Sequence, residues 1–275
     1  FAMKTIFPLV ITWLALHGAL APTLPAAAPD AEFIAVLQSN ATPQQKDAAC
    51  VRLKRIGTAA AVPALAPLLT DEQLSHSARY ALESLPAPEA GQALISALPQ
   101  TSGLLRAGVA QSLGLRRERA AVPALGKLLA DADADSALAA AHALGLIADA
   151  PALTALQAAW PKASGALRLA VADGLLACGN QLLAEKQWAQ AAAVFESLSA
   201  IKELPAIRQA GCRGLFLASG EQALNLVIEA LKTGDAPAQM AALQVARDLK
   251  APGATLALAK LLSETQPAMQ AAIME

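Results

Sequence analysis

Aromatic and charged residues are both scarce in this chain of 275 residues, at 3% and 16% of the total. Aromatic and β-branched residues favour strands, so their scarcity argues against a protein built on sheets. Apolar residues nevertheless make up 55% of the chain, and most of them are alanine and leucine, which favour helices. This apolar content is enough to form a core, which argues against disorder. The composition therefore predicts an all-α fold.

The chain also lacks an excess of charge of one sign, because it contains 21 Lys and Arg residues and 22 Asp and Glu residues. A protein that binds nucleic acid usually carries a basic patch, so we expect no nucleic-acid partner. The sequence contains no Gly-x-Gly-x-x-Gly, no Gly-x-Ser-x-Gly and no Gly-Lys-Ser/Thr phosphate loop. No carboxylate pair stands out as a glycosidase site. The sequence thus predicts no catalytic residue and no cofactor.

Cysteine and histidine are too few and too far apart to suggest a metal site. Cys50, Cys178 and Cys212 are separated by 128 and 34 residues, which excludes Cys-x-x-Cys and structural zinc patterns. We expect each thiol to be a small buried apolar group. The spacing leaves a disulfide between Cys178 and Cys212 open without favouring it. His76 and His142 are 66 residues apart and should lie in different layers of the fold.

Three acidic residues alternate in one short segment, at Asp131, Asp133 and Asp135. Such a pattern invites comparison with a calcium loop. An EF-hand loop, however, also needs a glycine and a distant glutamate, and here a plain helical pattern follows instead. We therefore interpret the segment as a turn whose last acid caps the next helix, where negative charge is favourable.

The first residues have the pattern of a secretory signal. From Met3 the chain continues with the single basic Lys4, an apolar run over 6–20 and small residues up to Ala28. We predict that 1–28 is a signal peptide, preceded by two extra residues before the methionine, and that the protein is periplasmic or extracellular. The apolar run is short for a membrane-spanning helix, so we expect no stable membrane insertion after signal removal. An uncleaved anchor remains the alternative.

Internal repeats indicate the architecture. The segment Ala60–Leu65 recurs as Ala120–Leu125, and a leucine recurs about every 30 residues within a small apolar pattern typical of a core-facing helix. These anchor positions are Leu53, Leu82, Leu113, Leu144 and Leu175, followed after 40 residues by Leu215 and after 30 more by Val245. We therefore predict two helices in each unit, the first of which starts near an Ala-Val-Pro or similar element. Pro63 and Pro123 suit the first turn of such a helix. One hairpin cannot bury both of its faces, so neighbouring hairpins must stack.

The repeated Ala-Val-Pro-Ala-Leu-x-x-Leu-Leu, followed by an acidic turn and by His142–Ile147, resembles the HEAT-like repeats of about 30 residues first noted in phycobilisome lyases. The resemblance implies an α-solenoid of seven to eight hairpins over 29–275. The predicted units are 30–57, 58–86, 87–117, 118–149, 150–186, 187–219, 220–250 and an incomplete 251–275. A helix still in progress at 266–275 indicates truncation, and with it the N-terminal part of a longer chain.

The 40-residue step marks a departure from the repeat. Residues 175–199 are similar to a longer, tetratricopeptide-like hairpin, with Trp188 and Phe195 at apolar positions. Such a hairpin would change the local curvature of the solenoid. It would serve either as a spacer, which we favour, or as a binding ridge.

A column of cations recurs seven residues before the anchors, at Lys46, Arg106, Arg168 and Arg208. In HEAT-like repeats, an arginine at this position commonly pairs with an acid in the turn of a neighbouring unit. The resemblance therefore implies a structural ladder. The ladder is incomplete, because three units carry other residues at this position, namely Ser75, Ala137 and Ala238. The alternative is a set of free cations that meets an acidic partner.

Other polar residues fall near this column. Arg79 and His142 are expected on the same second-helix face, which we predict to be concave and to carry any protein-binding surface. Arg116, Arg117 and Arg119 form a local basic cluster in a turn. A solvated turn is the first interpretation of this cluster, and contact with an anionic partner is the second.

The sequence predicts a monomeric, non-catalytic exported scaffold that binds a protein or spaces other domains. The alternative is an accessory region of a larger exported enzyme, carbohydrate-active or redox, whose catalytic domain lies downstream. A tetrapyrrole lyase, suggested by analogy with the repeat type, is disfavoured. Its pocket should offer aromatic residues, and Tyr80 is the only tyrosine in the chain. Fold resemblance alone says little about function.

Overall fold

The computed structural model describes residues 28–249, 253–262, 264, 270–271 and 273. Within these ranges the regular structure is entirely helical, which confirms the predicted all-α class. The predicted signal peptide lies outside the described residues except for Ala28, as does most of 266–275. Among the described helices, none is both long and apolar enough to cross a membrane.

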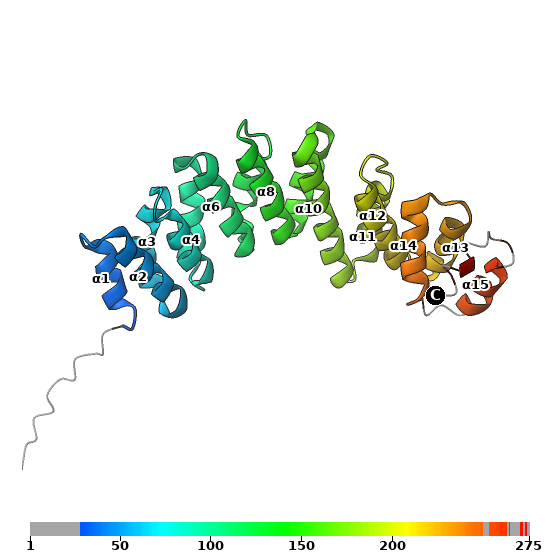
Figure 1. Cartoon of the computed structure of the whole chain (residues 1–275), viewed down its shortest axis with the longest axis horizontal. Coiled ribbons are helices and arrows are strands. Elements are labelled where there is room, and N and C mark those ends of the chain that lie inside the picture. Colours follow the sequence, from blue (N-terminus) through cyan, green and yellow to red (C-terminus); the bar gives the residue numbers. More distant parts are fainter. Residues whose placement is uncertain (1–27, 250–252, 263, 265–269, 272, 274–275) are drawn as a thin grey trace, which may run out of the picture.

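The described α-helices form seven consecutive pairs, followed by α15 (Ala254–Leu262), along the curved path seen in Figure 1. The first helices are α1 (Ala31–Gln38), α3 (Val62–Leu65), α5 (Pro88–Ala97), α7 (Val122–Leu128), α9 (Ala150–Ala159), α11 (Trp188–Ser199) and α13 (Ala223–Thr233). The second helices are α2 (Pro43–Ile56), α4 (Ser75–Ser84), α6 (Gly103–Leu115), α8 (Ala134–Ile147), α10 (Gly165–Ala184), α12 (Pro205–Ala218) and α14 (Ala236–Ala246). The pairs agree with the predicted units, and successive second helices pack side by side.

Short 3₁₀ turns precede or extend several first helices. They are η1 (Ala59–Ala61), η2 (Ala66–Thr70), η3 (Leu98–Gln100), η4 (Arg119–Ala121), η5 (Trp160–Lys162) and η6 (Gly220–Gln222). Pro63 and Pro123 lie in the first turns of α3 and α7, as predicted, because a proline there gives up no helical hydrogen bond. At α2, Thr42 and Gln45 form a reciprocal capping box.

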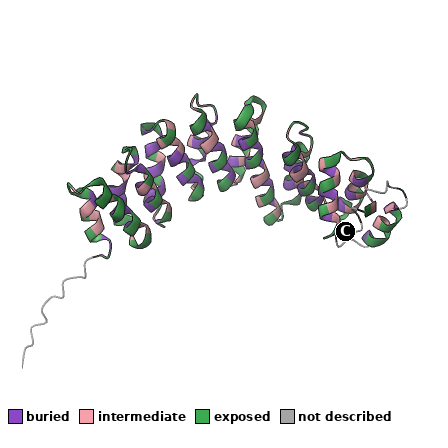
Figure 2. Cartoon of the chain, viewed as in Figure 1, coloured by how far each residue is buried: buried purple, intermediate pink, exposed green. Residues whose placement is uncertain are grey.

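The predicted anchors lie in the core, with one exception. Leu53, Leu82, Leu113 and Leu144 are fully buried, and Leu175 and Val245 nearly so. Leu215 is only half-buried, and its neighbour Phe216 takes the buried place in α12. The predicted register is therefore wrong by one residue here, in the unit that follows the longer fifth unit. Figure 2 shows that buried positions recur in every pair from α1 to α14.

Glycines allow the second helices to approach one another closely. A Cβ atom added at Gly114 of α6 would lie 2.6 Å from Cα of Ala143 in α8. A Cβ atom added at Gly145 of α8 would lie 2.9 Å from Cα of Gly174 in α10. Both distances are too short for real atoms, so the repeated Leu-Gly pair is a requirement of packing between neighbouring units.

The longer hairpin predicted near 175–199 is present. Helix α10 has 20 residues, against 10–14 in the other second helices, and α11 follows directly. Phe195 of α11 lies between α10 and α12 and is 1% exposed. It packs on the backbone of Gly179 and Gly214, where added Cβ atoms would lie 2.8 and 2.3 Å from the ring. Phe195 thus joins the two helices of the hairpin to each other and to α12.

Candidate functional site

A groove on the second-helix layer brings together two of the predicted site residues. Arg79 of α4 and His142 of α8 both line it, with α6 between them, and its volume is about 410 Å³. Gln111 and Asp135 supply further polar groups, and both are exposed. The other predicted residues, Lys46, Arg106, Arg168 and Arg208, do not line this groove.

Arg79 is held in place by the neighbouring unit. Its Nη1 atom donates to the carbonyl oxygen of Gly108 at 3.0 Å and to Oγ of Ser112 at 3.2 Å. Ser112 in turn donates to a carboxylate oxygen of Glu83 at 2.7 Å. Burial lowers the pKa of Arg79 from its ordinary value, and the nearby carboxylate of Glu83 opposes this shift. The guanidinium group is therefore a fixed donor rather than a mobile surface charge.

A glycine makes room for this arginine. A Cβ atom added at Gly108 would lie 2.5 Å from Cζ of Arg79, so a larger residue there would displace the guanidinium group. Gly108 was not among the site residues predicted from the sequence. A glycine in the interior of a helix lowers stability relative to alanine. A glycine at such a position therefore indicates that another group approaches the backbone closely, and this signal was present in the sequence.

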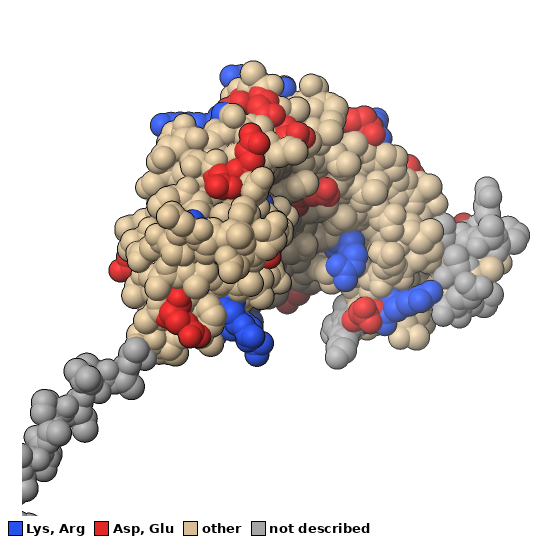
Figure 3. Space-filling view, turned by 60° about the vertical axis from the view of Figure 1, so that its left-hand side comes forward, with Lys and Arg blue, Asp and Glu red and all other residues tan. Residues whose placement is uncertain are grey.

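Large apolar side chains also line the groove. Leu104 of α6 is 78% exposed and Leu146 of α8 is 40% exposed. Exposed leucines beside a fixed arginine make a surface with both apolar and polar contact groups. Elsewhere on the molecule, the face shown in Figure 3 carries scattered acidic and basic side chains on a mostly uncharged surface.

Three of the four column cations pair with acids of the following unit. Arg106 lies 2.7 Å from Asp131, Arg168 lies 2.7 Å from Glu203, and Arg208 lies 2.8 Å from Asp235. The hydrogen bonds to Arg168 are the main reason why the pKa of Glu203 is lowered. Lys46 makes no ion pair within the described part of the chain.

The same arginines also contact their own unit. Nε of Arg106 donates to the carbonyl oxygen of Thr101 at 2.8 Å, and Nη1 of Arg208 donates to that of Ser199. The guanidinium group of Arg168 stacks on the ring of Trp160, 3.8 Å from its centroid. Each of the three side chains therefore connects the start of one second helix to the next unit, so we expect them to stabilise the stack.

Replacing Arg106 with alanine is expected to lower the free energy of unfolding by about 1–2 kcal/mol, because its ion pair with Asp131 is mostly shielded from water. Lys46→Ala removes a cation of the same column that has no described ion pair, and it should change stability by less than about 0.5 kcal/mol. Thermal and urea unfolding of both variants provide the measurement. Equal midpoints for Arg106→Ala and the unchanged protein would contradict a stabilising role.

The basic cluster at 116–119 is not a continuous solvated patch. Arg116 points inward, and its guanidinium group donates to the carbonyl oxygens of Leu82, Leu85 and Ala87 at 2.6–3.1 Å. This side chain satisfies carbonyl groups at the end of α4 that have no partner within the helix. Only Arg117 and Arg119 remain exposed, so interpreting all three arginines as a solvated turn was wrong for Arg116.

The acidic turn is used within the fold. Oδ2 of Asp131 accepts from Arg106, and Oδ1 accepts from the backbone N–H of Asp133 at 2.9 Å. Asp133 occupies the N-cap position of α8, and the hydrogen bond from Ser136 lowers its pKa. The predicted capping residue, Asp135, instead lies in the first turn. In the ranges that the structure describes, no cluster of His, Cys, Asp and Glu has the arrangement of a metal site.

All three cysteines are buried free thiols, as expected for small apolar groups. Burial raises the pKa of Cys50 to about 11 and that of Cys178 to about 12. The pKa of Cys212 is also raised, again mainly by burial. The thiolate is the reactive form, so these side chains are chemically inert in the folded protein.

Of the comparisons with known proteins, the match to a family model agrees with this architecture. The comparison with curated proteins gives no match. Among solved structures, the complex of CpcE and CpcF of phycocyanin lyase from Nostoc sp. PCC7120 is similar at 20% identity, with 97% of this chain and 98% of that chain covered and a TM-score of 0.40. Residues 91–176 match the family model of HEAT repeats. This segment runs from α5 to α10, and together with the paired helices it confirms an all-α solenoid that contains HEAT repeats.

Proposed function

We propose that this chain is a non-catalytic helical-repeat scaffold that binds a protein segment in the groove of α4, α6 and α8. The observation that carries this proposal is the combination of the fixed Arg79 with the exposed Leu104 and Leu146 in one groove. Arginine is enriched among the residues that dominate binding energy at interfaces, and exposed leucines beside it offer apolar area that a partner can bury. Solenoid proteins commonly bind partners along such extended surfaces.

The groove suggests the chemistry of the bound segment. Leu104 and Leu146 offer apolar surface for one large side chain of the partner. Arg79 has five N–H donors, and the described partners occupy only part of them, so it can also receive a carbonyl or carboxylate oxygen. Gln111 and His142 add further hydrogen-bonding groups beside it. We expect a segment with an apolar anchor next to a hydrogen-bond acceptor.

The binding experiment uses a photo-crosslinking amino acid placed at Gln111 in the groove. A matched position is Gln157, which is exposed on the first helix α9. In an extract of the source organism, a defined partner should be cross-linked from position 111 and not from position 157. Equal capture from both positions would show that the groove is not the binding site.

Affinity for the captured partner gives the quantitative test. Leu104→Asp should weaken binding at least tenfold, because it places a charge in the apolar part of the interface. Leu256→Asp is the matched control, since Leu256 is 77% exposed against 78% for Leu104 but lies in α15. Identical affinities for the two variants would reject the proposed site.

We also propose that the protein is exported, on the basis of the signal-like pattern from Lys4 to Ala28. Expression of the full chain in a bacterial host should give a periplasmic product whose N-terminus is removed near residue 21 or 28. Intact-mass measurement identifies the cleavage point. A cytoplasmic product that retains Met3 would reject export.

A further inference from the structure

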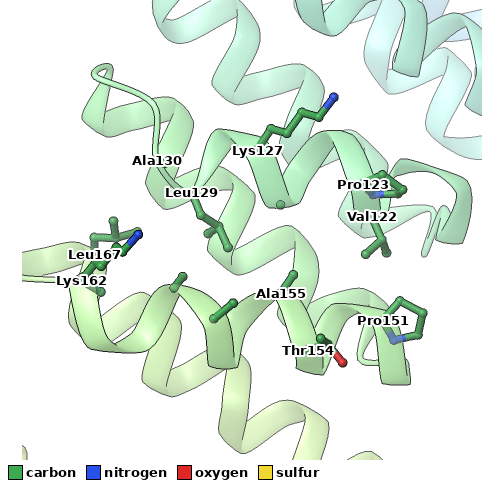
Figure 4. Close-up of a pocket in the computed structure, with 14 residues that line it drawn as sticks. Val122, Pro123, Lys127, Leu129, Ala130, Pro151, Thr154, Ala155, Lys162 and Leu167 are labelled. Carbon is green, nitrogen blue, oxygen red and sulfur yellow. The ribbon is translucent and has the colours of Figure 1, made fainter.

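A second groove lies in the layer of first helices, between α7 and α9. Its volume is about 680 Å³, within the range of sites that hold small molecules. Figure 4 shows Val122 and Leu129 on the side of α7 and Ala155 on the side of α9. Val122 and Leu129 are themselves almost fully buried, so they form a fixed apolar wall.

The lining of this groove offers few hydrogen-bonding groups. Pro123 and Pro151 stand at one end and have no N–H group. The hydroxyl group of Thr154 already donates to the carbonyl oxygen of Ala150, at 3.0 Å within its own helix. An extended peptide would therefore bury backbone amides without partners, which is costly. An unbranched hydrocarbon chain has no such groups to satisfy.

The only charged residues in the lining are two lysines, Lys127 and Lys162. Both are exposed, and within the described residues neither makes an ion pair with an acid. Figure 4 shows Lys162 beside Leu167, at the end of the groove opposite the two prolines, while the amine of Lys127 points away from the lining. The charge of the groove thus favours an anion, and favours it at the Lys162 end.

We propose that this groove binds a free fatty acid, with the acyl chain between α7 and α9 and the carboxylate at Lys162. The chain would run from the Lys162 end towards Pro151, a span of roughly 16 Å at the helical rise per residue. This distance suits a chain of medium length. The site is separate from the groove of α4, α6 and α8, and the proposal does not depend on protein binding there.

The test is calorimetric titration of the full chain with monomeric dodecanoate, and with dodecyltrimethylammonium as a probe of equal chain length and opposite charge. We expect saturable binding of one dodecanoate per chain and much weaker binding of the cation. Lys162→Ala should weaken dodecanoate binding by about threefold to fivefold, the effect of one exposed ion pair. Ala155→Phe should fill the groove and weaken binding at least tenfold.

The matched control is Ala139→Phe, which fills the other groove in the same way. It should leave the affinity for dodecanoate unchanged. Thermal unfolding of each variant shows whether it is folded. Lys162→Ala alters only an exposed side chain, so we expect this variant to fold. Its dodecanoate affinity therefore remains decisive if Ala155→Phe does not fold. Four results would overturn the proposal. Two concern the ligand, namely equal binding of anion and cation, and binding to phosphatidylglycerol vesicles without saturable binding of dodecanoate. Two concern the variants, namely unchanged dodecanoate binding by Lys162→Ala, and equal weakening by the two phenylalanine variants.

Discussion

Phe195→Ala is expected to lower the free energy of unfolding by about 3–5 kcal/mol, the usual cost of truncating a buried aromatic side chain. Phe195 is 1% exposed and fills the space between α10 and α12. The glycines that receive its ring, Gly179 and Gly214, have no side chains that could refill the cavity. Urea unfolding followed by circular dichroism measures the loss.

Trp188→Ala is the matched control on the same helix, because Trp188 is also aromatic but is 49% exposed. It should lower the free energy of unfolding by only about 1–2 kcal/mol, because about half of its apolar surface is already exposed to water. In a solenoid each unit contacts only its neighbours, so Phe195→Ala should also separate the unfolding of the two ends into distinct steps. A small effect of Phe195→Ala, similar to that of the control, would contradict its role in joining three helices.

Arg116→Ala is expected to cost about 3 kcal/mol, because hydrogen bonds to a charged donor are strong and their loss leaves buried carbonyl groups without partners. The side chain of Arg116 is only 9% exposed, and it reaches several carbonyl oxygens between Leu82 and Ala87. Arg116→Lys should recover only part of the stability, since an ammonium group cannot span these acceptors as a planar guanidinium group does.

The neighbouring Arg117 provides the control. It is exposed, and its φ angle of 51° is in the left-handed region for either arginine or alanine. Arg117→Ala should therefore stay within about 0.5 kcal/mol of the unchanged protein. Thermal melts compare the three variants. Equal losses for Arg116→Ala and Arg117→Ala would show that net charge, and not the cap of α4, is responsible.

The helix pairs were predictable because their signals are local and repeated. Each unit carries its own anchor, and the first helices α3, α5, α7 and α9 each carry a proline in the first turn, so an error in one unit does not spread to the next. The prediction was wrong at Leu215, which lies in the unit after the longer fifth unit and stands beside a second apolar residue, Phe216. Local pattern cannot choose between Leu215 and Phe216, because the choice depends on how α12 turns against Phe195 of the preceding helix.

The candidate site was predictable only in part. Arg79 and His142 were placed on one face by the repeat, and the structure brings both into one groove. The exposed Leu104 and the glycine at 108 were not foreseen. Gly108 belongs to the contact between α4 and α6, where Arg79 donates to its carbonyl oxygen from 29 residues away in the chain.

The sequence by itself determined the all-α fold class, through its alanine and leucine content. It also determined the helix pairs, through the repeat length, and the column of arginines, through their spacing from the anchor leucines. Only the tertiary structure decided what the polar groups do. Arg116 differs little from Arg117 as a residue in the chain, yet one caps a helix and the other is exposed to solvent. The grooves likewise arise from the distances between stacked helices, and these distances depend on side chains that come from different units.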